Sequence, residues 1–126
     1  MTTDTKKALT TQEVAERFDK LAQQESWFAI QDELFADHVR SIEPLDSPYL
    51  KYAEGKGPVR KKGEDWVAKV KEVHRTYTSH PVVGGHHFAV GRNLDITVEG
   101  FGSVKIDQIM LYEVKDGLIV SEQFVY

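Results

Sequence analysis

The first third of the chain has the hydrophobic spacing of helices. Apolar residues recur every three or four positions from Val14 to Leu21, behind the capping-box sequence Thr-Thr-Gln-Glu at residues 10–13. This pattern predicts a helix that ends near residue 24. The same spacing returns over residues 26–37, where Ser26 can cap a shorter second helix.

From His38 the residues alternate between the two sides of an extended chain instead of following this helical spacing. Every second residue of a strand points to the same side, so Val39, Ser41 and Glu43 should share one face. Pro44 lacks the N–H group that the next ladder position needs, and it ends the pattern. We therefore predict a short strand over residues 38–43 with a carboxylate at its end.

The segment 45–63 is rich in prolines, glycines and lysines, which interrupt regular structure and predict a long loop. Its lysines lack the Gly-Lys-Ser/Thr ending of a phosphate-binding loop, so we interpret their charge as incidental. A third helix is predicted from about Glu64 to Arg75, and the remaining sequence is strand-like. This order indicates an α+β fold, in which N-terminal helices wrap a strongly curved antiparallel sheet around one pocket.

Composition limits the classes of protein that fit. The 126 residues suit a single domain, 1–126, and 40% hydrophobic with 29% charged residues is the mixture of a globular protein. No apolar run approaches the ~20 residues of a membrane span. A net charge of -4 with scattered basic residues argues against nucleic acid as a partner. The polar stretch Met1–Lys7 and the absence of cysteine favour a cytoplasmic location.

Two turns set the predicted pairing of the last strands. Asp116-Gly117 lies between two apolar runs, which is typical of a two-residue hairpin turn. It places Lys115 opposite Leu118. The same register gives three further pairs on one side of the sheet, namely Leu111 with Glu122, Ile109 with Phe124 and Asp107 with Tyr126.

The second turn, Glu99-Gly100, places Arg92 opposite Asp107, Val90 opposite Ile109 and Phe88 opposite Leu111, although Gly102 can shift this register. Both registers converge on Asp107. We therefore expect Asp107, Arg92 and Tyr126 to meet on the concave side of the sheet. The same parity leaves an apolar outer face that a homodimer would cover, formed by Val104, Ile106, Met110, Tyr112 and Val125.

Several local strings and their order resemble the nuclear transport factor 2-like superfamily, particularly its SnoaL-like members and the ketosteroid isomerases. The strings are Leu34-Phe35-Ala36-Asp37, then Ile42-Glu43-Pro44, Ile106-Asp107, and Asp116-Gly117-Leu118-Ile119-Val120. The resemblance covers nearly the whole chain. It implies a cone-shaped, commonly dimeric fold with a mostly apolar cavity. Members of this superfamily include enzymes, carriers and association domains, so the fold alone does not decide the function.

The resemblance also assigns roles to two carboxylates. Glu43 matches the general base of the ketosteroid isomerases, and burial would tune such a carboxylate for proton transfer near neutral pH. The alternative is a structural carboxylate paired with a cation or with backbone donors. Asp107 matches the acid that donates a hydrogen bond to the developing oxyanion, but pairing with Arg92 would remove that donor. Phe18 stands where the family has a tyrosine, so steroid isomerisation is not expected.

Two functions fit these observations. The first is a small-molecule-binding domain that acts as an isomerase, cyclase or lyase by proton transfer on an apolar carbonyl compound. The second is a non-catalytic ligand carrier or a dimeric association module, and an open cavity beside Glu43 would favour the first. The sequence contains no metal-binding motif, and we expect no cofactor. Besides Glu43 and Asp107, the residues expected to line the pocket are Phe18, Trp66, Phe88, Val90, Arg92, Ile109, Glu122, Phe124 and Tyr126.

Overall fold

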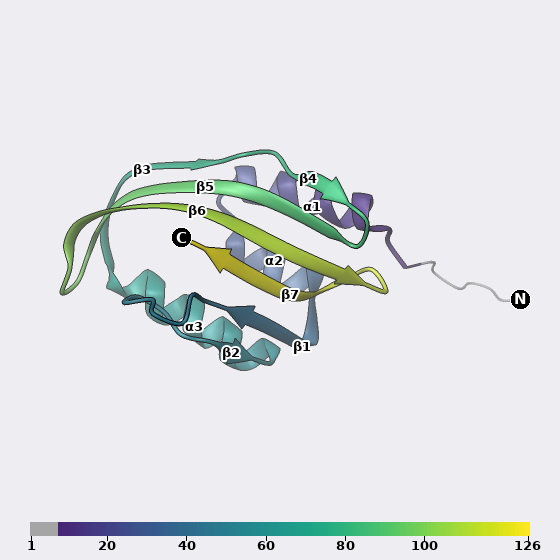
Figure 1. Cartoon of the computed structure of the whole chain (residues 1–126), viewed down its shortest axis with the longest axis horizontal. Coiled ribbons are helices and arrows are strands. Elements are labelled where there is room, and N and C mark those ends of the chain that lie inside the picture. The colour runs from purple at the N-terminus through teal and green to yellow at the C-terminus, as the bar shows by residue number, and fades with distance from the viewer. Residues whose placement is uncertain (1–7) are drawn as a thin grey trace, which may run out of the picture.

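The computed structural model describes residues 8–126, so the polar stretch Met1–Lys7 lies outside the described residues. Three helices and seven strands follow one another along the chain (Figure 1). The helices are α1 (Thr11–Gln23), α2 (Trp27–Leu34) and α3 (Lys56–Lys69). The strands are β1 (Phe35–Ile42), β2 (Ala53–Glu54), β3 (Val70–Thr78), β4 (Val82–Gly84), β5 (His87–Val98), β6 (Gly102–Lys115) and β7 (Leu118–Val125).

The first two helices form where the hydrophobic spacing predicts them. The predicted capping box is present: the Thr10 side chain accepts a hydrogen bond from the Glu13 backbone N–H, and the Glu13 carboxylate accepts one from the Thr10 N–H. Ser26 precedes α2 but makes no capping hydrogen bond with its side chain. The second helix ends at Leu34, three residues before the predicted end, because the chain continues directly into β1.

The third helix differs from the prediction at both ends. It begins at Lys56, because Gly55 turns the chain with a φ of 94° and Pro58 lies in the first helical turn, where its missing N–H is not needed. It ends at Lys69, and residues 70–78 form β3 instead of continuing the helix. The predicted long loop is therefore largely helical, and its lysines lie on a helix that packs against β1.

The sheet has the strand order β2-β1-β7-β6-β5-β3, with β4 paired to β5. Strands β1 and β7 run parallel, whereas the other pairs are antiparallel, so the sheet is mixed. Figure 1 shows β5 and β6 as long, curved strands with α1 and α2 behind them. The α+β class predicted from the sequence is confirmed, with one parallel pair in place of a purely antiparallel sheet.

Both predicted turn registers are wrong by one residue. At Asp116-Gly117 the pairing of Lys115 with Leu118 is as predicted, but Val120 is an extra residue in β7 that shifts every later pair. The other turn contains three residues, 99–101, because Gly102 adopts a φ of 76°. The observed pairs on β6 are therefore Gln108 with Arg92, Met110 with Val90 and Phe124, and Tyr112 with Phe88 and Glu122.

A shift of one residue turns every side chain of β6 to the opposite face. Asp107 is exposed on the outer face, where it accepts a hydrogen bond of 2.8 Å from the Asn93 amide. The predicted meeting of Asp107 with Arg92 and Tyr126 does not occur. The residues predicted for the outer face are also corrected: Ile106, Met110 and Tyr112 are buried on the concave side, and Val104 packs beside them.

The main core lies between α1, α2 and the concave face of the sheet. Phe18 is fully buried there, and its ring packs against Trp27, Phe88 and Tyr112 with centroid distances of 5.9, 5.1 and 4.7 Å. Val90 belongs to the same cluster. Phe18, Phe88 and Val90 thus act as core residues in place of the ligand contacts predicted for them. Within residues 8–126, no helix is both long and apolar enough to cross a bilayer.

Candidate functional site

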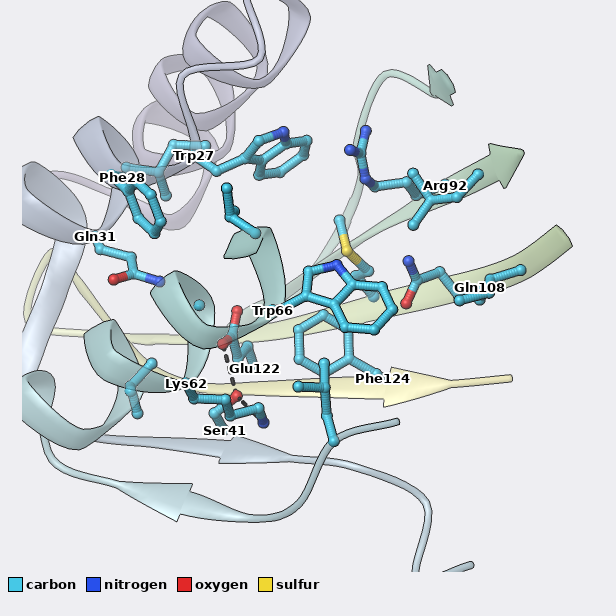
Figure 2. Close-up of a pocket in the computed structure, with 18 of the residues that line it drawn as sticks. Trp27, Phe28, Gln31, Ser41, Lys62, Trp66, Arg92, Gln108, Glu122 and Phe124 are labelled. Carbon is cyan, nitrogen blue, oxygen red and sulfur yellow. Dashed lines mark hydrogen bonds between the residues drawn. The ribbon is translucent and has the colours of Figure 1, made fainter. Parts of the chain in front are cut away.

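A cavity of about 780 Å³ lies between α2, α3 and the concave side of the sheet. Figure 2 shows side chains from all three regions pointing toward it. This volume is within the range of small-molecule pockets. Most of its lining is apolar and comes largely from Trp27, Phe28, Tyr49, Trp66, Leu94, Met110 and Phe124. The polar lining side chains are gathered in two places.

The first polar group is centred on Lys62 of α3. Its ammonium lies 2.7 Å from Glu43 Oε2, and the two side chains are only 12% and 2% exposed. That oxygen receives no hydrogen bond of regular geometry from the residues described, so the ion pair with Lys62 offsets the cost of burying its charge. The Tyr126 hydroxyl donates to the other oxygen, Oε1, at 2.6 Å. Glu43 is therefore a buried carboxylate clamped between a cation and a phenol.

A second carboxylate, Glu122, completes this group. The parallel pairing of β1 with β7 sets Ser41 directly opposite Glu122. The Ser41 hydroxyl donates to Glu122 Oε2 at 2.7 Å and accepts a hydrogen bond from Lys62 at 2.8 Å, as Figure 2 shows. Ser41 thus links the two carboxylates through the lysine. We call Ser41, Glu43, Lys62, Glu122 and Tyr126 the acid cluster.

Burial raises the pKa of Glu122 to about 7, and the negative charge of Glu43 adds to this effect. The hydrogen bond from Ser41 and the charge of Lys62 act in the opposite direction without cancelling it. Burial and the nearby Glu122 carboxylate likewise hold the pKa of the Tyr112 phenol well above its usual range. Glu122 is thus a cavity-lining acid that exchanges its proton near neutral pH.

The second polar group surrounds Arg92 of β5. Its guanidinium donates to both oxygens of Glu25 at 3.3 and 3.1 Å and to the Thr78 hydroxyl at 2.8 Å. It also lies over the Trp27 ring, 4.4 Å from the centroid. Gln108, the cross-strand partner of Arg92, lines the same part of the cavity. We call Arg92, Gln108 and Glu25 the arginine corner.

Comparison with known proteins identifies the family. The sequence pattern of the SnoaL-like domain matches residues 9–126. This chain belongs to the SnoaL-like domain family. Its predicted membership of the nuclear transport factor 2-like superfamily is thereby confirmed. No functionally curated protein matches the chain.

Solved structures place the SnoaL-like chain among proteins of the same fold. A protein from Mesorhizobium loti, whose name places it among the SnoaL-like polyketide cyclases, is 32% identical over 94% of this chain and 100% of its own, with a TM-score of 0.87. A protein of ketosteroid isomerase-like fold from Catenulispora acidiphila, solved with trimethylamine, is 16% identical over 93% and 87% of the two chains, with a TM-score of 0.68. TerC, crystallised with polyporic acid, is 10% identical over 92% and 90%, with a TM-score of 0.69.

The structure brings only part of the predicted site of this SnoaL-like protein together. Of the residues predicted for the site, those that line the cavity are Glu43, Trp66, Arg92, Glu122, Phe124 and Tyr126. Asp107 and Ile109 lie on the outer face, and Ile109 is 54% exposed. Both misplacements follow from the one-residue shift of β6. No group of three or more His, Asp or Glu side chains within the described residues is arranged to hold a metal ion.

Sequence reasoning missed Lys62 and Ser41. The charge of Lys62 was interpreted as incidental because its segment was predicted to be a loop. Pro58 was the available signal, because proline is common in the first turn of a helix. A helix in this segment would turn one of its sides toward the strands. Ser41 was placed on the buried face with Val39 and Glu43, and a buried hydroxyl requires a hydrogen-bond partner. That requirement alone marks Ser41 as part of a polar site.

Proposed function

We propose that this SnoaL-like protein is an enzyme that moves a proton on an apolar carbonyl compound bound in the cavity, with Glu122 as the acid-base residue. The observation that carries the proposal is a buried carboxyl group that lines a ligand-sized cavity and whose pKa is raised by burial to about 7. A general acid-base residue works best when its pKa lies near the operating pH. The sequence alone favoured Glu43, whose carboxylate is instead committed to Lys62 and Tyr126.

Lys62 is the electrophilic group in this proposal. Its ammonium carries three N–H bonds, and its contacts with Glu43 and Ser41 leave one to meet a ligand oxygen. A fixed cation in a mostly apolar cavity stabilises a developing negative charge more strongly than it would in water. Glu43 and Tyr126 hold the lysine in place and act as positioning residues.

The reaction begins with the carboxylate form of Glu122, which takes a proton from the carbon next to the ligand carbonyl. The C–H electron pair becomes a C=C bond, and the carbonyl π electrons move onto oxygen to give an enolate that Lys62 stabilises. The protonated Glu122 then returns the proton to another carbon, to a leaving group or, in a ring closure, to the oxygen of the second carbonyl that the enolate carbon attacks. Isomerisation, aldol-type ring closure and elimination all share this first step.

The relatives support a small-molecule ligand. The Mesorhizobium loti protein bears the name of a polyketide cyclase, and two proteins of the same fold were solved with trimethylamine and polyporic acid. A cavity of about 780 Å³ also argues against a pure association module, whose interior side chains would fill the space. A non-catalytic carrier is the remaining alternative.

A proton-exchange assay separates the enzyme from the carrier. The probe is naphthalene with an acetyl group at each end, whose methyl protons are acidic, and proton NMR follows their exchange in D₂O. We expect the wild-type protein to accelerate exchange and Glu122→Gln to reduce this acceleration by about 100-fold or more, because Gln cannot accept the proton. Glu43→Gln should cost less, since it loosens Lys62 without removing the base.

Asp107→Asn is the matched control, because it makes the same chemical change on the outer face of the sheet. Its exchange rate should equal that of the wild-type protein. A probe that binds without any acceleration of exchange would indicate a carrier. Equal rates for wild-type and Glu122→Gln protein would remove Glu122 from the mechanism.

We also propose that a second copy of the chain covers the outer face of the sheet. Register pairs Ile109 with Val125 on this face and places Val82 on the same face in the neighbouring row, opposite Ala89; Val82, Ile109 and Val125 are 76%, 54% and 52% exposed. The small residues Ala89 and Gly91 lie between them. Exposed charges of both signs border this apolar strip, as a self-complementary surface requires, namely Arg75, Lys105 and Asp107.

Light scattering at micromolar concentration tests this interface. We expect a dimer for the wild-type chain and a monomer for Ile109→Arg, which buries a charge opposite its own copy in a symmetric contact. Leu45→Arg is the control, since Leu45 is fully exposed away from the sheet face and its replacement should leave the dimer intact. A wild-type monomer would contradict the proposed interface.

A further inference from the structure

The arginine corner and the Lys62–Glu122 part of the acid cluster are separate polar ends of one cavity, whereas Tyr126 follows Val125 on β7 and so lies near the strand position of Gln108. In Figure 2, Arg92 and Gln108 lie on one side, Ser41, Lys62 and Glu122 lie on the other, and the Trp66 indole stands between them in this view. The register gives the spacing. Tyr112 pairs with Glu122 and Gln108 lies four residues earlier on β6, which corresponds to about 13 Å along the strand. A ligand that reaches both ends must be elongated.

The side chain between these two positions on the concave face of β6 is apolar. Met110 separates Gln108 from Tyr112, and its cross-strand neighbour is Phe124. Trp66 adds a flat aromatic surface from α3. Apart from the Trp66 indole N–H, the described residues in the middle of the cavity are apolar, and this region suits the ring system of an apolar ligand.

The fixed charges of the lining are already balanced. Lys62 is paired with Glu43, and Arg92 is paired with Glu25. Glu122 adds a negative charge only when it loses its proton, so the lining carries no excess positive charge. An anionic ligand would lie close to the Glu25 carboxylate at one end or to two carboxylates at the other. An uncharged ligand meets none of this repulsion.

Gln108 supplies a further hydrogen-bonding group to the arginine corner. It lines the cavity next to Arg92, and Figure 2 draws no hydrogen bond between its amide and the other residues shown. A side-chain amide in such a place gains most from a ligand that accepts its N–H. Glu25 and Thr78 use three of the four terminal N–H bonds of the Arg92 guanidinium, and the remaining one, on Nη2, can serve the same acceptor.

Glu25 has a backbone conformation that is unfavourable for glutamate, which indicates that its side chain is needed at this position. It follows α1 with a φ of 56°, in the left-handed region where glycine or asparagine is preferred. Its carboxylate accepts hydrogen bonds from Arg92 and from the Trp27 indole at 3.0 Å. Glycine would relieve the backbone but lose both contacts. Glu25 is therefore a positioning residue that orients and neutralises Arg92.

We propose that the arginine corner binds a carbonyl oxygen at the far end of the ligand, and that the ligand is an uncharged, elongated apolar compound with an acceptor oxygen at each end. The proposal rests on the proposed function, because it takes the acid cluster as the reacting end. It adds that the arginine corner selects substrates with a second oxygen, separated from the reacting carbonyl group by about two fused rings.

Three naphthalene probes test this selection by equilibrium binding. The first has an acetyl group at each end, the second has a single acetyl group, and the third has an acetyl group at one end and a carboxylate at the other. Trp27 and Trp66 line the cavity, so quenching of their fluorescence reports binding. We expect the diketone to bind the wild-type protein roughly tenfold more tightly than the monoketone, as one added hydrogen bond allows, and the keto acid to bind more weakly than the diketone.

Gln108→Leu should abolish the preference for the diketone while leaving the affinity for the monoketone unchanged. Glu25→Gln should invert the charge preference, because it leaves the Arg92 charge unpaired, so that the keto acid becomes the tightest ligand. A purely structural role for Glu25 would not alter the ranking of the probes.

The proposal is overturned if the wild-type protein binds the diketone and the monoketone equally, prefers the keto acid, or shows no saturable binding of the diketone. It is also overturned if Gln108→Leu keeps the full preference. These measurements need no turnover. Loss of exchange in Glu122→Gln with an unchanged probe ranking in Gln108→Leu would preserve the proposed function and remove the second subsite.

Discussion

Replacing Lys62 with methionine is expected to lower the free energy of unfolding by about 3–5 kcal/mol. The substitution leaves the Glu43 carboxylate, whose side chain is 2% exposed, without the cation that is paired with it. It also removes the hydrogen bond that Ser41 accepts. An uncompensated buried charge is among the few changes that produce a loss of this size. Urea unfolding at neutral pH measures it.

Lys61→Met is the matched control, one residue before Lys62 in the same helix. Lys61 is 75% exposed and pairs with the exposed Asp65, so the free energy of unfolding should change by no more than about 0.5 kcal/mol. Adding Glu43→Leu to Lys62→Met should restore much of the lost stability, because no charge is then left unpaired. Equal stabilities for Lys62→Met and Lys61→Met would show that Glu43 does not depend on this ion pair.

The stability difference between Glu122→Gln and the wild-type protein should change with pH by about 3 kcal/mol in favour of the variant, between pH 4.5 and pH 7. The pKa of Glu122 is raised in the folded protein to about 7, from an ordinary value of 4.5. Across this range Glu122 holds its proton more strongly in the folded state than in the unfolded state. The contribution of Glu122 to wild-type stability therefore falls as pH rises and is largely lost above pH 7.

Thermal or urea unfolding of both proteins from pH 4 to pH 8 measures this difference, in which the titrations of all shared groups largely cancel. We expect the curves to run together below pH 4.5 and to separate up to pH 7. Carbon NMR of the Glu122 carboxyl group gives the same pKa directly. A difference that stays constant with pH would mean that folding does not raise the pKa of Glu122, which would also weaken its role as a neutral-pH acid.

This cost in stability has a functional meaning under the proposed mechanism. Replacing a buried acid with a neutral isostere should stabilise the protein at neutral pH while removing the proton acceptor. The ionised Glu122 of the acid cluster would then lower the stability of the fold while serving as the proton acceptor. Joint measurement of stability and proton exchange in Glu122→Gln tests whether the two effects occur together.

Local sequence signals were sufficient for α1, the start of α2 and the directions of side chains in β1, β5 and β7. The capping box at Thr10 is formed by residues three positions apart, so no distant contact was needed to predict it. Strand parity correctly placed Ser41 and Glu43 together on a buried face. The family resemblance then added the cone-shaped architecture and a cavity near Glu43.

Register was the point at which local signals failed. The extra residue Val120 and the three-residue turn at 99–101 each shift β6 by one position relative to a neighbour. Because side chains alternate along a strand, this difference of one residue places Asp107 on the outer face and Gln108 in the cavity, the reverse of the prediction. Bulges depend on packing across strands, and neither Val120 nor Gly102 encodes its bulge unambiguously.

The sequence by itself determined the α+β class, the helical faces and the placement of Glu43 and Glu122 on inward-facing strand positions, because these depend on spacing along the chain. Only the tertiary structure decided which charges meet. Lys62 reaches Glu43 because α3 begins at Lys56 and packs against β1, and Glu122 meets Ser41 because two strands distant in sequence pair in parallel. Glu122 titrates near neutral pH for the same reason, since its pKa depends on burial and on neighbours from β1 and α3 that no local pattern specifies.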